Sequence, residues 1–327
     1  LHNLDTTIKE PFASNPAVLD AVEKNHKKLQ IAMTKLYPGN LVLSLSSGIM
    51  YHRLVDRITA LNDVPREPLV PRRLGKNMCV PFGKILRGKV VPNTVTKTLH
   101  TDKVYEPDLN SFTIEPFPYY SPLKSQIETI KSFDRPVILV DDLVHKADRL
   151  QVLVPQLRED GIPIRKVVVG VLSGYGRDLM QCLKVPVESI YSMPNLRQWF
   201  VESTLYPFIG GDTVRREEMK VAGLQPSINM ILPYATPRLS GCSREALVEF
   251  SACCIENSRD LFQVLEAEYR KMYAKNLTLS RLSEAVILPL CPDKGSCMEY
   301  DENLAASVYL ENDLETLWRM KEFLIKG

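Results

Sequence analysis

Two adjacent carboxylates, Asp141 and Asp142, are the residues of this chain whose type and spacing most clearly suggest chemistry. They follow residues 137–140, four apolar residues of which three are β-branched, a pattern that predicts a buried strand. Neighbouring carboxylates repel each other unless a cation, a metal ion or sugar hydroxyls lie between them. The pair therefore indicates a ligand site. The structural alternative is that both residues only end the strand and open a turn, as Asp often does.

The elements around the pair predict a βαβ unit. A helix is expected from Asp148, as its N-cap, to Gly161, and residues 164–172 are expected to form a second buried strand. Pro155 should kink this helix or destabilise it by about 3 kcal/mol. Ligands of open parallel sheets bind at the carboxyl ends of the strands, so the acidic pair is expected at the ligand-binding edge.

This segment resembles the type I phosphoribosyltransferases, whose signature is four apolar residues, two acids, two apolar residues and a loop of small residues that enters a helix. The resemblance implies that Asp141 and Asp142 face the ribose hydroxyls of phosphoribosyl pyrophosphate and act with Mg²⁺. It also implies that the loop holds the 5′-phosphate through N–H groups at the start of the helix. The loop positions are His145, Lys146, Ala147, Asp148 and Arg149.

The loop departs from the family pattern. It contains no glycine, which limits how closely its backbone can approach a phosphate, and Asp148 adds a negative charge. Lys146 and Arg149 would compensate as side-chain phosphate ligands, or they are only the solvated start of a helix.

A second anion-binding loop is expected at Ser46, Ser47 and Gly48. They lie between a predicted strand at 41–45 and a predicted helix at 49–58, an arrangement that presents N–H donors to an anion. The resemblance implies that a loop in this order holds the pyrophosphate.

Residues 65–103 form a basic segment, with nine Lys or Arg against two acids. The resemblance implies a flexible loop that closes over the pyrophosphate, with Lys97 or Lys103 stabilising its departure and His100 between them. A solvated surface is one alternative. A nucleic-acid patch is another, disfavoured because few aromatic residues are available for base stacking.

Trp199 and Phe200 follow the last predicted core strand, 185–191. The resemblance implies that an aromatic side chain here stacks on the acceptor base, for which a flat apolar face suffices. Either ring is equally suited to the hydrophobic core.

The chain of 327 residues exceeds the usual size of one core, so several segments are expected. They are an N-terminal helical segment at 1–38, an α/β core at 39–212 and a mainly helical C-terminal region at 213–327. Long helices are expected within 243–275 and at 313–326. Cys291 and Cys297 are predicted to flank a loop, because a zinc site would need a tighter pair and two further ligands.

Composition indicates a globular protein, with 45% hydrophobic and 24% charged residues and a net charge of +2. This charge gives no general case for nucleic acid or membrane as a partner. No apolar run approaches the roughly 20 residues that span a bilayer. The first residue, Leu1, suggests a processed piece without a signal peptide, and seven Cys fit reduced thiols in the cytoplasm.

The sequence thus predicts an α/β protein with a parallel-sheet, phosphoribosyltransferase-like core and a helical C-terminal extension. The implied activity is that of a glycosyltransferase: transfer of a phosphoribosyl group from phosphoribosyl pyrophosphate to a nitrogenous base, with Mg²⁺. A non-catalytic sensor of nucleotides or ribose phosphates is the alternative. A response-regulator receiver is disfavoured, because its acids belong to the first strand. The oligomeric state stays open, with a homodimer as one option.

Overall fold

The chain forms two compact units in the computed structural model, which describes residues 1–71, 73–217, 220–237, 239, 241–294 and 299–326. Unit 1 comprises Leu1–Ser44, Val104–Ser111 and Phe200–Gly327, and unit 2 comprises Leu45–Lys103 and Phe112–Trp199. These units differ from the three predicted segments, 1–38, 39–212 and 213–327. The reason is that helix α1 (Pro16–Leu36) packs along helix α7 (Arg244–Tyr273), which joins the N-terminal helix to the C-terminal region.

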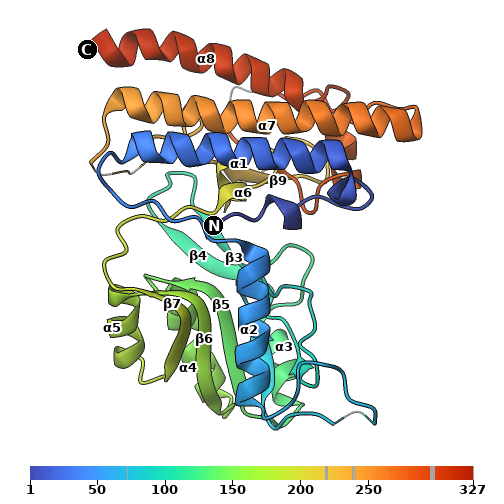
Figure 1. Ribbon diagram of the computed structural model, residues 1–327, viewed down its shortest axis with the longest axis vertical. Helices are drawn as coiled ribbons and strands as arrows, with labels where there is room; N and C mark the ends of the chain where they lie inside the picture. Colours follow the sequence, from blue (N-terminus) through green and yellow to red (C-terminus); the bar gives the residue numbers. More distant parts are fainter. Residues whose placement is uncertain (72, 218–219, 238, 240, 295–298, 327) are drawn as a thin grey trace. The chain divides into compact units, whose positions relative to one another are not determined.

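Unit 2 is built on a five-stranded parallel sheet, which confirms the predicted α/β fold class (Figure 1). In spatial order the strands are β2 (Val95–Thr96), β1 (Met78–Pro81), β5 (Val137–Val144), β6 (Ile164–Ser173) and β7 (Val187–Met193). Residues 137–140 are at most 1% exposed, because helices cover both faces of the sheet. The buried strand predicted from their composition is therefore present.

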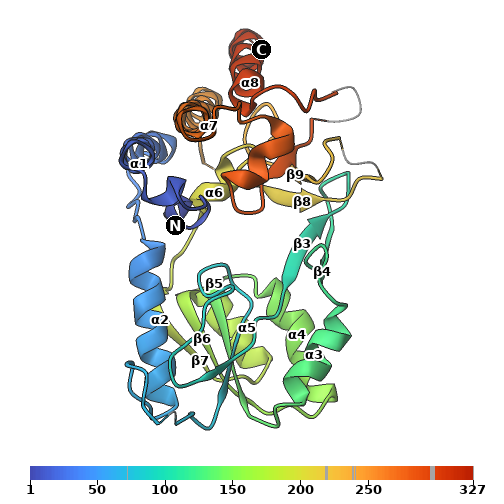
Figure 2. The ribbon, with the colours of Figure 1, turned by 90° about the vertical axis from the view of Figure 1, so that its right-hand side faces the viewer.

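Four helices accompany this sheet: α2 (Ser47–Leu61), α3 (Leu123–Lys131), α4 (Asp148–Glu159) and α5 (Gly174–Cys182). Figure 2 shows α2 on one face of the sheet and α3 and α4 on the other. Helix α4 packs Leu150, Leu153 and Leu157 onto the sheet, at the spacing of one helical face. Pro155 lies on its exposed side, and the helix continues past it to Glu159.

Several local predictions were wrong. Residues 41–45, all of them described, form no strand, and Leu41 and Leu43 are exposed. Strand β5 does not end at residue 140 but continues through both aspartates, because β6 pairs with it as far as Val144. Ala147 takes the N-cap position of α4 in the left-handed conformation, with φ of 54°, and Asp148 is the first helical residue.

Unit 1 contains α1, α7 and α8 (Ala306–Lys326), which lie side by side in Figures 1 and 2. This confirms the helical C-terminal region, although α8 begins at Ala306 and not at residue 313. The shorter helices are η1 (Leu4–Thr6), η2 (Phe12–Ser14), α6 (Glu202–Leu205) and η3 (Leu279–Glu284).

A second sheet has the strand order β10 (Leu290–Pro292), β9 (Gln225–Ile228), β8 (Asp212–Val214), β3 (Thr101–Tyr105) and β4 (Phe112–Pro116). Cys291 is buried in β10, which ends at Pro292, and Cys297 lies outside the described residues, so the predicted loop between them stays a prediction. Within the described part of the chain, no helix combines the length and apolar character needed to cross a membrane.

Candidate functional site

The five strands of the parallel sheet end at a common edge. Gly83 and Lys84 follow β1, Lys97 follows β2, His145 and Lys146 follow β5, and Ser173 ends β6. The acidic pair lies in β5, two residues before the end of the strand. β6 pairs alongside it, whereas β1 ends opposite Val140, one residue before the pair.

The Asp142 carboxylate holds the loop that follows β1. It accepts hydrogen bonds from the backbone N–H groups of Lys84, at 2.7 Å, and Ile85, at 3.0 Å. Such bonds to an ionised carboxylate are among the stronger hydrogen bonds in proteins. Asp142 therefore anchors a neighbouring loop, a role that the sequence did not suggest.

Gly83 is the residue that allows this close approach. A Cβ atom added here would lie 2.5 Å from Asp142 Oδ1 and 2.8 Å from Asp141 Oδ1, closer than real Cβ contacts. The loop at 83–85 thus forms the direct surroundings of the acidic pair. Like the pattern expected at Ser46–Gly48, it follows a strand and contains a glycine, but the N–H groups of Lys84 and Ile85 donate to the Asp142 carboxylate.

Asp141 lies in a different environment from its neighbour. Burial raises its pKa to about 7, and the charge of Asp142 adds to this rise. The guanidinium groups of Arg149 and Arg87 and the backbone N–H of Asp142, which donates to Asp141 Oδ1 at 2.8 Å, oppose the rise. Near neutral pH the pair therefore carries less than two negative charges.

Arg87 brings a buried positive charge to the site. Its guanidinium carbon lies 4.9 Å from the centre of the Phe117 ring. Its Nε and Nη2 atoms are buried and have no hydrogen-bond partner among the described residues. Burial lowers its pKa, the charge of Arg149 lowers it further, and Asp102 and Asp142 raise it. A buried donor without an acceptor is unfavourable by about 1–3 kcal/mol, so an anionic ligand would satisfy this group.

The sequence identifies Arg87 only as one of the nine basic residues of the segment 65–103. The signal that would have identified it is its position shortly after β1, a strand that was not predicted. Met78–Pro81 is short, ends in proline and lies within a charged segment, so it lacks a periodic pattern.

The negative charge of Asp148 is paired. Its Oδ2 lies 3.3 Å from Nζ of Lys103, which also lies 3.7 Å from the centre of the Phe112 ring. The predicted catalytic Lys103 is thus placed at the start of α4. The positive charge of Lys103 offsets the negative charge of Asp148, the residue that departs from the phosphate loop expected at His145–Arg149.

His145 connects the ends of β5 and β6. Its Nδ1 lies 2.8 Å from Oγ of Ser173, and that hydroxyl also accepts the N–H of Gly176 at the start of α5. Burial lowers the pKa of His145, and so does the charge of Lys146, against the opposite effect of Asp148. The neutral imidazole is therefore favoured.

The predicted loop Ser46, Ser47 and Gly48 forms the start of α2, where Ser46 Oγ accepts the N–H of Ile49 at 3.5 Å. One turn later, Met50 packs against Gly170 of β6: a Cβ on Gly170 would meet Met50 Sδ at 2.0 Å and the Asp142 carbonyl at 2.6 Å. The helix start is therefore near the acidic strand.

The other predicted residues are not brought together. Lys97 is exposed and donates its backbone N–H to the carbonyl of Cys79, while the ring of His100 stacks on Tyr120 at 3.8 Å. Trp199 is 47% exposed in unit 2, whereas Phe200 belongs to unit 1 and packs against Phe250. Phe200 therefore packs against the hydrophobic core of unit 1, which was the alternative prediction for this ring.

Comparisons with known proteins leave the family open. No family model matches the chain, and no curated protein matches it in sequence. Among solved structures, a purine phosphoribosyltransferase from Pyrococcus horikoshii aligns with 11% identity over 49% of this chain and 97% of its own, with a TM-score of 0.29. A hypoxanthine phosphoribosyltransferase from Trypanosoma cruzi, in complex with IMP, aligns with 16% identity over 49% of this chain and 80% of its own, with a TM-score of 0.28. TM-scores this low do not establish a shared fold or function.

Proposed function

We propose that this protein binds phosphoribosyl pyrophosphate or a related ribose phosphate at the carboxyl edge of its parallel sheet, and that it transfers the phosphoribosyl group to a nitrogenous base. The observation that carries the proposal is the buried Arg87 guanidinium, which has hydrogen-bonding capacity to spare beside a second guanidinium, Arg149. Two repelling cations next to an acidic pair fit a ligand that presents both phosphate oxygens and hydroxyl groups.

Each group has a distinct task in this reaction. Arg87 and Arg149 hold phosphate oxygens, and Asp141 accepts hydrogen bonds from the ribose hydroxyls. Asp142 keeps the Gly83–Lys84 loop against the ligand. The bond from C1′ to the pyrophosphate oxygen breaks while a bond from C1′ to the base nitrogen forms. Catalysis is therefore electrostatic, through stabilisation of the departing pyrophosphate, to which the exposed Lys97 would contribute.

Carboxylate oxygens suit Mg²⁺, which commonly binds one or two carboxylates together with substrate phosphates. Asp141 fits this part, because the backbone N–H of Asp142 occupies only one of its oxygens, whereas both oxygens of Asp142 accept backbone N–H groups. When bound, the ion would neutralise charge on the pyrophosphate. It would also lower the pKa of Asp141 by stabilising the ionised form.

A sensor without turnover is the second candidate. The observation that favours it is the absence of glycine from residues 143–149, together with Asp148 at the start of α4. This sensor would use the same arginines and the same acidic pair to bind its ligand.

Titration calorimetry with phosphoribosyl pyrophosphate and Mg²⁺ tests the binding step. Arg87→Gln should weaken affinity by about tenfold or more, because a hydrogen bond to a charged group contributes about 1.5–3 kcal/mol. Arg165→Gln is the matched control, since this exposed arginine lies at the opposite end of β6. Equal affinities of Arg87→Gln, Arg165→Gln and the wild type would show that Arg87 does not contact the ligand.

Asp142→Asn is a second variant. It should also weaken binding by about tenfold or more, since the amide cannot accept both N–H groups as the carboxylate does. Pyrophosphate release with a panel of nitrogenous bases then separates enzyme from sensor: tight binding without release for any base would favour the sensor.

A further inference from the structure

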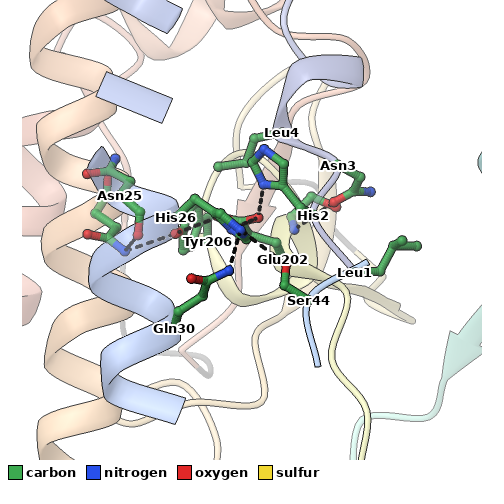
Figure 3. A network of polar contacts seen from close by, with 12 residues as sticks. Leu1, His2, Asn3, Leu4, Asn25, His26, Gln30, Ser44, Glu202 and Tyr206 are labelled. Carbon is green, nitrogen blue, oxygen red and sulfur yellow. Dashed lines mark hydrogen bonds and ion pairs between the residues drawn. The ribbon is translucent and has the colours of Figure 1, made fainter. Parts of the chain in front are cut away.

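Two histidines and a glutamate converge in unit 1, whereas the residues of the proposed transferase site belong to unit 2. His2 precedes η1, His26 lies in α1, and Glu202 begins α6 (Figure 3). Nδ1 of His26 lies 3.2 Å from Glu202 Oε2, and Nδ1 of His2 contacts the same oxygen. The two imidazole rings are 4.0 Å apart between centroids. One ligand atom from each of the three residues lies within 4.8 Å of the others.

The Glu202 carboxylate is held in place by a hydrogen bond to the oxygen that does not face the imidazoles. Glu202 is 3% exposed, and its Oε1 accepts a hydrogen bond from the buried Tyr206 hydroxyl at 3.4 Å. The same hydroxyl accepts from Asn257 Nδ2 at 2.9 Å. The backbone N–H of Ser203 donates to Asn3 Oδ1, which ties α6 to the segment that carries His2. Oε2 therefore faces the imidazoles in a fixed orientation.

His26 is oriented through its second nitrogen. Its Nε2 lies 2.8 Å from the Gln30 side-chain amide and 3.1 Å from Ser44 Oγ. A metal on Nδ1 requires a proton on Nε2, and a hydroxyl or a carboxamide oxygen accepts that proton. The Gln30 side chain accepts this proton when its carboxamide oxygen, and not its nitrogen, faces His26 Nε2. Which of the two atoms faces the ring is decided by the hydrogen-bond network.

We propose that His2, His26 and Glu202 form a site for a divalent transition-metal ion, with Zn²⁺ as the best match. Two imidazoles and one carboxylate are a known protein ligand set for Zn²⁺, which leaves a fourth position open. The two histidine side chains are 21% and 20% exposed, so solvent reaches this side of the cluster. The ion would join three segments that are distant in sequence, so its binding would stabilise unit 1.

The test uses the 327-residue chain without a histidine tag, freed of metal with a chelator. Zn²⁺ is titrated in competition with a chromophoric chelator. The wild type should bind one ion per chain, and His26→Gln and Glu202→Gln should each bind about tenfold more weakly or worse. His52→Gln is the matched control, because His52 is exposed and lies in unit 2.

Replacing the buried Glu202 risks unfolding, so His2→Gln provides a second test at a partly exposed ring, with circular dichroism as the check on folding. Co²⁺ provides an independent readout. Its spectrum should show d–d bands without a thiolate charge-transfer band, and the d–d bands should vanish in folded His2→Gln. No wild-type binding, an unchanged affinity in folded His2→Gln and His26→Gln, or a thiolate band would each overturn the proposal.

Discussion

Two neighbouring aspartates can differ in charge because their surroundings differ. Asp142 accepts two backbone N–H groups, one on each carboxylate oxygen. Asp141 loses solvation by burial beside that charge, and its pKa rises to about 7. At the proposed site, a ligand would therefore meet one fixed carboxylate and one that releases its proton as cations arrive.

The raised pKa of Asp141 makes a prediction about stability. The folded state retains this proton to higher pH than the unfolded state, so its contribution to the free energy of unfolding decreases from about pH 4 to about pH 7 and then stays low. In Asp141→Asn this pH-dependent decrease in stability is absent. The free energy of unfolding of the variant, relative to that of the wild type, should therefore increase by about 2 kcal/mol as the pH rises from 5 to 8, measured by urea denaturation.

Asp178→Asn is the control for this measurement, because Asp178 is an exposed carboxylate in α5. Its stability difference from the wild type should not change with pH in this range. A difference between Asp141→Asn and wild type that is equally independent of pH would contradict the raised pKa.

Two glycines distinguish the loop after β1 from the start of α2. Gly83→Ala should destabilise the protein by about 1–3 kcal/mol and weaken binding of phosphoribosyl pyrophosphate, because its Cβ would displace the Asp142 carboxylate. Gly48→Ala has room, since the nearest atom is Ser46 Oγ at 3.7 Å, and alanine favours the helix by up to about 1 kcal/mol. Chemical denaturation and calorimetry on both variants measure the difference. If only Gly48→Ala bound phosphoribosyl pyrophosphate more weakly, the anion site would be at Ser46–Gly48 and not at the loop after β1.

At the scale of elements, the βαβ unit was predictable and its neighbours were not. β5, α4 and β6 each carry a long apolar or amphipathic pattern, which local sequence is sufficient to reveal. Leu41 and Leu43 alternate as in a strand, yet among the residues that the structure describes no strand pairs with them, and they are exposed. Their alternation has the period of a strand, but a segment forms a strand only where the tertiary structure provides a sheet for it to pair with, which the local sequence does not reveal.

The start of α4 allows a prediction about its charge. Asp148→Asn removes a negative charge near the proposed phosphate position and leaves Lys103 without this ion-pair contact. Affinity for phosphoribosyl pyrophosphate should rise about threefold, in line with the modest strength of a partly exposed ion pair. Asp160→Asn, at the other end of the helix, is the matched control for the calorimetry. Weaker binding in Asp148→Asn would show that Asp148 supports the ligand.

At the scale of the whole chain, the sequence did not reveal that residues 1–44 and the C-terminal part from Phe200 onward form one unit. The pairing of α1 with α7 depends on buried polar contacts between residues more than two hundred positions apart. Asn25 Nδ2 donates to the Asn257 carbonyl at 2.6 Å, and Asn257 Nδ2 donates to the Asn25 carbonyl at 2.9 Å. Neither residue stands out in its own helix, so local patterns could not pair them.

This reciprocal contact should be important for stability. Asn257→Ala should lower the free energy of unfolding by about 1–3 kcal/mol, because the buried Asn25 carbonyl and Tyr206 hydroxyl lose the hydrogen bonds that Asn257 Nδ2 donates to them. Asn312→Ala, at an exposed position of α8, should change it by less than about 0.5 kcal/mol. Equal effects of the two substitutions in urea denaturation would contradict the packing of α1 on α7.

The most direct test of the proposed ligand site is a crystal structure of the protein with ribose 5-phosphate. We expect the phosphate oxygens against the guanidinium groups of Arg87 and Arg149, and the ribose hydroxyls at Asp141. A ligand bound elsewhere in a well-ordered crystal, with the carboxyl edge of the sheet vacant, would contradict the account.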